Sequence, residues 1–133
     1  MGDRGQVHIF YGRHKLQHNI WLYTHWDAES LINIVRNAMR RGEDRHGDPE
    51  YLTRIIFSEM IQNDIRGTYG YGIGNSQHGD VWRVVEVDCT TKNIIVYDNG
   101  YIVLEKSFEK FISNGELYQD KNFMKNLLLC SMD

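Results

Sequence analysis

The segment 20–35 constrains the fold of this chain most, because it passes from strand periodicity to helix periodicity without a linker. Its first residues alternate bulky side chains between two faces, as residues along a β-strand do. Its later residues repeat apolar side chains at three- and four-residue steps, which is typical of an amphipathic helix. The chain must turn sharply at His25, Trp26 and Asp27, and such corners often carry ligand sites.

Asp27 occupies the position that should cap this helix. A carboxylate at an N-cap accepts hydrogen bonds from backbone N–H groups of the first turn, so we expect Asp27 to bind the amide of Glu29 or Ser30. The remaining N–H groups of a first helical turn form a ready site for an anion. The corner is therefore the first candidate for a binding surface.

Strand patterns recur in five other segments, at residues 6–12, 68–74, 81–87, 93–98 and 101–106. The first should pair with the strand that opens segment 20–35 as an antiparallel hairpin, with His8 and Phe10 on the face opposite Val7 and Ile9. The last three should form a meander, because Asn99-Gly100 is the strongest short-range hairpin signal.

Helix patterns predict one helix from Ala28 to Gly42, a second over residues 50–64 capped by Asp48, a short third after Ser107, and a last over residues 122–130. The second helix is apolar over too wide an arc for one neighbour. Either another subunit or another helix of the same chain must cover the rest. We therefore predict one α+β domain over residues 1–133, with an antiparallel sheet of about five or six strands, helices on one face, and a homo-oligomer.

Charge and hydropathy restrict the partners. The net charge is −3, and the first half balances its basic and acidic residues, so no field favours long nucleic acid. No apolar run approaches the roughly 20 residues of a membrane span. Residues 1–4 lack the features of a secretory signal, which predicts a reducing cytoplasm with Cys89 and Cys130 as free thiols. Most basic residues of the first half are Arg. Their planar guanidinium groups could bind a small phosphorylated ligand. Alternatively, these Arg residues lie on solvated helix faces.

The glycine-rich residues 67–74 lack the Lys of a phosphate-binding P-loop and lead into a strand, which excludes P-loop and Rossmann sites. Glycine on one face of a strand lets a backbone or a ligand approach closely, and a base could stack on Tyr69 or Tyr71. The alternative is a bulged strand with aromatic packing. No metal-ligand spacing, nucleophile motif or cofactor motif is present, although His25 with Asp27 and His78 with Asp80 form His-x-Asp pairs.

Four segments, residues 2–5, 22–27, 51–57 and 68–74, together resemble a family of small uncharacterised proteins from bacteria, archaea and their viruses. The Leu-Tyr-Thr-His-Trp-Asp corner is the most specific part of this resemblance, which implies no catalytic residues. In size, composition and expected oligomerisation the chain is similar, more weakly, to phage proteins that sequester nucleotide signals of bacterial immunity, the anti-CBASS and anti-Thoeris sponges. That similarity implies action in a host cytoplasm.

These patterns lead us to expect non-enzymatic binding and sequestration of a small phosphorylated or cyclic nucleotide. The expected ligand contacts are the phosphate-binding Arg4, Arg54 and Arg66, the stacking residues Trp26, Tyr69 and Tyr71, and the corner residues His25 and Asp27. One alternative is a small hydrolase or phosphodiesterase that uses His25 and Asp27. Another is an inhibitor that binds a host protein through the apolar second helix.

Overall fold

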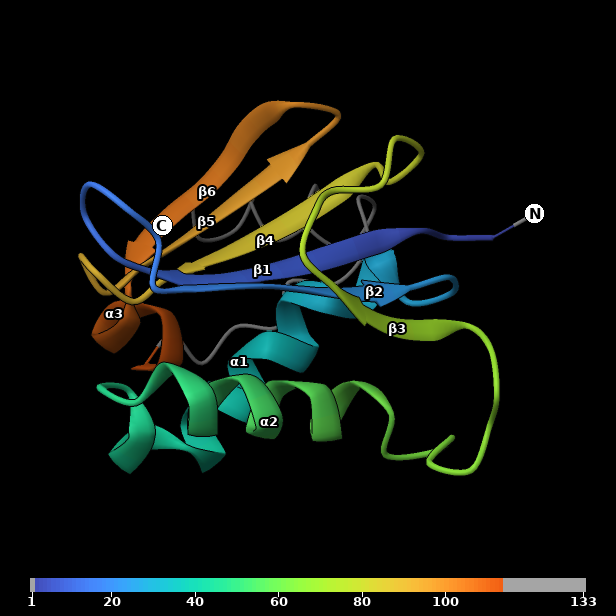
Figure 1. Cartoon of the computed structure of the whole chain (residues 1–133), viewed down its shortest axis with the longest axis horizontal. Helices are drawn as coiled ribbons and strands as arrows, with labels where there is room; N and C mark the ends of the chain where they lie inside the picture. The colour runs from blue at the N-terminus through green and yellow to red at the C-terminus, as the bar shows by residue number, and fades with distance from the viewer. Residues whose placement is uncertain (1, 114–133) are drawn as a thin grey trace, which may run out of the picture.

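A computed structural model describes residues 2–113 of the chain (Figure 1). The first two strands, β1 (Gly5–Tyr11) and β2 (His18–Thr24), form the predicted antiparallel hairpin. Val7 and Ile9 of β1 are fully buried on the face that the helices cover, as the alternation of the sequence predicts. The loop between the strands is polar and exposed.

The helical part begins with a short 3₁₀ turn, η1 (Ala28–Ser30), which leads into α1 (Leu31–Arg41). Gly42 ends α1, as predicted, and a second 3₁₀ turn, η2 (Glu43–Arg45), follows. Helix α2 (Pro49–Met60) starts at the predicted cap, where the Asp48 side chain accepts from the Tyr51 backbone N–H. It ends four residues earlier than residue 64, because residues 61–67 fold into successive tight turns.

The remaining elements are β3 (Tyr71–Gly74), β4 (Arg83–Asp88), β5 (Asn93–Asp98), β6 (Tyr101–Ser107) and α3 (Phe108–Ser113). Strands β4 to β6 form the predicted meander. Asn99 and Gly100 both have positive φ, 50° and 87°, as this type of tight hairpin turn requires. The Ser107 hydroxyl accepts from the Lys110 backbone N–H and caps α3, which confirms the predicted cap.

The sheet has the strand order β3-β2-β1-β4-β5-β6. It confirms the α+β class and the predicted size of the sheet, but the sheet is mixed, because β1 and β4 run parallel. The hairpin occupies one edge of β1, and the chain returns to the other edge only after both helices and β3. A strand that returns in this way is free to enter in the same direction as β1, and no hairpin geometry forces an antiparallel pair.

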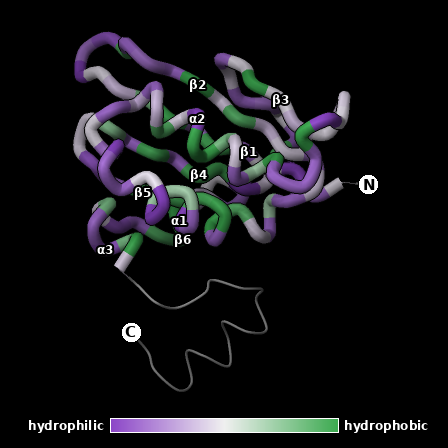
Figure 2. Tube along the Cα trace, turned by 90° about the horizontal axis from the view of Figure 1, so that it is seen from below, coloured by the Kyte–Doolittle hydropathy of each residue, from purple (hydrophilic) through white to green (hydrophobic). Residues whose placement is uncertain are grey.

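The helices gather on one face of the sheet, below it in Figure 1. The core lies between these layers, and apolar segments gather toward the middle of the molecule while hydrophilic loops surround them (Figure 2). Helix α2 buries Leu52, Ile55 and Ile56 in this core and also packs on α1. The same chain therefore covers much of the wide apolar arc, and the homo-oligomer stays a prediction.

The expected helix over residues 122–130, with Cys130, lies outside the described residues. Within residues 2–113, no helix is long and apolar enough to cross a membrane. Cys89 is a free, buried thiol, as predicted for that residue.

His18 should make the stability of the fold depend on pH. Its Nε2 lies 2.8 Å from the Thr53 hydroxyl on α2, and burial lowers the pKa of His18 below 6.5 although the charge of Glu50 opposes the shift. Because the pKa of His18 is lower in the folded state than in the unfolded state, protonation of His18 disfavours the fold. The stability of the fold therefore decreases as the pH falls below about 6.5.

We expect the melting temperature to fall between about pH 7.5 and pH 5.5, and to fall less in a His18→Gln variant. Thermal denaturation followed by circular dichroism at both pH values measures this difference. Equal falls in the two proteins would contradict the assignment to His18.

Candidate functional site

The corner after β2 is held by the N-terminal residues. The Asp3 backbone N–H donates to the carbonyl oxygen of His25 at 2.7 Å, and the Ala28 N–H donates to the carbonyl oxygen of Asp3 at 3.1 Å. The Asp3 carboxylate accepts from the Glu29 N–H at 2.9 Å and from the Trp82 indole N–H at 2.6 Å. Asp3 therefore makes the capping contact at the start of the helical segment.

The predicted cap by Asp27 is wrong, because the Asp27 side chain makes no capping hydrogen bond. Its carboxylate instead accepts from the Tyr71 hydroxyl at 2.5 Å and from the Thr24 hydroxyl at 3.4 Å. Burial, followed by the hydrogen bond to Asp27, raises the pKa of Tyr71 to about 12, so the phenol keeps its proton. A contact over a long sequence separation has replaced the local cap.

His25 and Asp27 contact different groups on opposite sides of the sheet. The Nδ1 atom of His25 accepts from Nε of Arg4 at 3.3 Å and lies 3.1 Å from the Tyr23 hydroxyl. Asp27 contacts Thr24, which is fully buried on the helix-covered face. The corner therefore brings His25 to Arg4 and does not pair it with Asp27.

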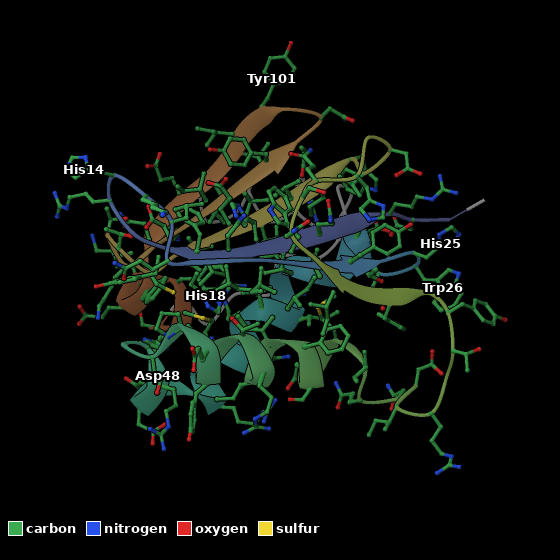
Figure 3. All side chains as sticks on the ribbon, in the orientation of Figure 1. His14, His18, His25, Trp26, Asp48 and Tyr101 are labelled. Atoms are coloured by element: carbon green, nitrogen blue, oxygen red, sulfur yellow. The ribbon has the colours of Figure 1, made fainter. Side chains whose placement is uncertain are left out.

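Trp26 and the two tyrosines expected beside it do come together. The ring centroid of Trp26 lies 5.8 Å from that of Tyr69 and 5.7 Å from that of Tyr71, both edge to face. His25 and Trp26 lie at the end of the sheet near the N-terminus (Figure 3). Arg54, on α2, and Arg66, in the loop after it, are both exposed, and no hydrogen bond or ion pair between described residues joins either to this corner.

The other face of the sheet, opposite the helices, is crossed by the loop of residues 75–82. The side-chain amide of Gln6, only 1% exposed, fixes this loop by donating to the Ser76 carbonyl oxygen at 3.2 Å and accepting from the His78 backbone N–H at 2.9 Å. The His78 ring stacks on Tyr23, with centroids 4.4 Å apart. Beside the loop, Gly72 and Gly74 face open space: no described atom lies within 4 Å of a Cβ added at either position.

A cavity of about 160 Å³ lies on this open face. Its aromatic walls are Trp21, Trp82 and Tyr97. The rest of the lining is made by Gln77 and Val81 of the crossing loop, Val84 and Glu86 of β4, and Gly100 of the β5–β6 turn. Partial burial, followed by the charge of Glu86 and a hydrogen bond to it, raises the pKa of the Tyr97 hydroxyl, which therefore stays protonated and donates.

His8 lies next to this lining and is 8% exposed. Its ring stacks on Trp21, with centroids 3.9 Å apart and planes at 10°, and on Phe10 at 4.7 Å. Its Nε2 lies 2.6 Å from Oδ1 of Asn19, and its Nδ1 lies 3.7 Å from Oε2 of Glu86. That Nδ1 is buried and has no hydrogen-bond partner within the described part of the chain.

The sequence placed His8 on the face opposite Val7 and Ile9 but did not identify the cavity, because its walls come from β2, β4, β5 and the crossing loop. No spacing in the sequence brings Glu86 beside His8; the parallel pairing of β1 with β4 does so. Among residues 2–113, no group of three or more His, Cys, Asp or Glu could hold a metal ion. Comparisons of the chain with protein-family models, curated proteins and solved structures found no match.

Proposed function

We propose that this protein binds and sequesters a small phosphorylated or cyclic nucleotide without converting it. The observation that carries the proposal is the cavity on the open face of the sheet, which has two Trp and one Tyr in its walls. Aromatic walls suit a base, because base–aromatic stacking contributes about 1–3 kcal/mol and every base has a flat face.

Arg4 is the cation best placed to contact a phosphate. The Trp82 backbone N–H donates to the carbonyl oxygen of Arg4 at 3.1 Å, so the backbone of Arg4 adjoins Trp82 of the cavity wall. The Arg4 guanidinium pairs with Asp80 at 3.2 Å, and the Asp80 side chain is 54% exposed. Such surface pairs contribute only about 0–1 kcal/mol, so a phosphate can replace the carboxylate on the planar guanidinium.

Two further observations favour binding over catalysis. His25 and Asp27, which a hydrolase or phosphodiesterase would need together, face opposite sides of the sheet. Burial, followed by the charge of Asp88, raises the pKa of Cys89 to about 12, so that thiol does not form the thiolate required of a nucleophile. Tight binding without turnover would sequester a nucleotide signal, which is the role of a viral anti-defence sponge.

Trp21→Ala should lower the affinity for a bound nucleotide roughly 5- to 150-fold, because it removes one stacking wall of the cavity. Calorimetry with a panel of nucleoside monophosphates and cyclic nucleotides measures the affinity. Tyr51→Ala is the matched control, since Tyr51 is an aromatic residue on α2, half exposed and on the helix side of the sheet. Its affinity should equal that of the unmodified protein.

Chromatography of the denatured complex separates the alternatives. A nucleotide released intact supports sequestration, whereas a converted nucleotide supports the hydrolase or phosphodiesterase. Binding that is lost in Trp26→Ala but kept in Trp21→Ala would move the site to the corner. Failure of every nucleotide to bind would overturn the proposal and favour the protein-binding inhibitor.

A further inference from the structure

We infer that Glu86, with His8 behind it, accepts a hydrogen bond from an amino group on a single six-membered ring, so that the cavity selects cytosine nucleotides over uracil nucleotides. This inference rests on the proposed nucleotide-binding function and names the base. It is carried by the side chains around Glu86, by the aromatic walls, and by the size of the cavity.

The environment of Glu86 favours a donor. Among the described residues, the Tyr97 hydroxyl hydrogen-bonds to its carboxylate, and Nδ1 of the His8 ring lies 3.7 Å from Oε2. Neither residue is an Arg or a Lys. An ionised carboxylate accepts up to about four hydrogen bonds, so Glu86 has further acceptor positions for a ligand in the cavity.

The hydrogen bonds of His8 fix its ring behind Glu86. Nδ2 of Asn19 donates to the Asn75 carbonyl oxygen at 3.5 Å, and Oδ1 of Asn19 lies 2.6 Å from Nε2 of His8, which therefore carries a hydrogen. The Nδ1 atom of His8 is covered and does not reach the ligand, so the acceptor that this pair offers to the cavity is the Glu86 carboxylate. A carboxylate attracts N–H donors and repels carbonyl oxygens.

The cavity has room for one six-membered ring. Its volume of about 160 Å³ is close to that of an engineered apolar cavity of about 150 Å³ that holds benzene. A pyrimidine fits between the aromatic walls, while the sugar and phosphate extend toward Arg4. Of the pyrimidines, cytosine carries an amino group at C4 and uracil carries a carbonyl oxygen there, and a Glu side chain accepts from the cytosine amino group.

Calorimetry with CMP and UMP tests the inference, because these nucleotides share the sugar and the phosphate. CMP should bind roughly 10-fold or more tightly than UMP, since UMP would place its O4 acceptor against Glu86. Equal affinities, or tighter binding of UMP, would overturn the inference and leave the proposed function intact. If neither nucleotide binds and the rest of the panel also fails, the proposed function falls and the inference falls with it; if other nucleotides bind, only the inference falls.

Glu86→Gln should remove most of the preference for CMP, because a side-chain amide can donate to O4 of UMP as readily as it accepts from CMP. Glu105→Gln is the matched control. Glu105 lies on the same face of the sheet, opposite Ile95, which in turn pairs with Glu86, and it is exposed on β6. The control removes the same charge and should keep the preference. A preference that persists in Glu86→Gln would overturn the inference.

Discussion

Replacing Asp98 with alanine should lower the free energy of unfolding by about 3–5 kcal/mol, because it leaves the guanidinium of Arg83 buried without its carboxylate. Arg83 is 4% exposed. Its Nε and Nη2 donate to the two carboxylate oxygens of Asp98, each at 2.7 Å. Its Nη1 donates to the carbonyl oxygens of Ala28 and Glu29, each at 3.3 Å, so the pair also ties the start of the helical segment to the sheet.

Asp80→Ala is the control for this prediction, because Asp80 pairs with Arg4 at the surface. Exposed pairs contribute about 0–1 kcal/mol, so this variant should unfold at nearly the same urea concentration as the unmodified protein. Equilibrium urea denaturation of the three proteins measures both effects. Similar losses in the two variants would mean that burial does not determine the contribution of the Arg83–Asp98 pair.

The local elements of this fold were predictable because their causes are local. Asn99-Gly100 forms its turn since both residues adopt positive φ. Asp48 caps α2 through a backbone N–H only three residues away. The alternation that buries Val7 and Ile9 follows from strand geometry alone. Each of these features depends on residues that are close in the sequence.

The wrong or missing predictions concern features that depend on contacts between residues far apart in the sequence. Asp27 had the right position to cap a helix, but Tyr71 contacts its carboxylate across 44 residues, and Asp3 binds the amide of Glu29 instead. The cavity depends in the same way on the pairing of β1 with β4, which sets Glu86 opposite His8. A sequence shows which face each residue occupies within its strand, but not which strands become neighbours.

The glycine-rich segment contains both a glycine that is required by a distant contact, Gly70, and one that is not, Gly72. Gly70→Ala should lower the free energy of unfolding by about 2–4 kcal/mol, as the combined effect of backbone strain and overpacking. Gly70 has a φ of +96°, which disfavours residues with a side chain, and an added Cβ would lie 2.1 Å from Cζ3 of Trp26. The carbonyl oxygen of Gly70 also accepts from the His25 backbone N–H at 2.8 Å, so a shift of this residue would disturb the corner.

Gly72→Ala is the matched variant, with the same chemical change two residues later in β3. A Cβ at position 72 meets no described atom within 4 Å, and Gly72 does not have a positive φ, so stability should change by no more than about 0.5 kcal/mol. Thermal and urea denaturation of both variants, with tryptophan fluorescence to follow Trp26, measure the contrast. If Gly72→Ala lowered the free energy of unfolding as much as Gly70→Ala, the contact of Gly70 with Trp26 would not explain the loss. The predicted contrast instead assigns Gly70 to the packing of Trp26 and leaves the surface above Gly72 open.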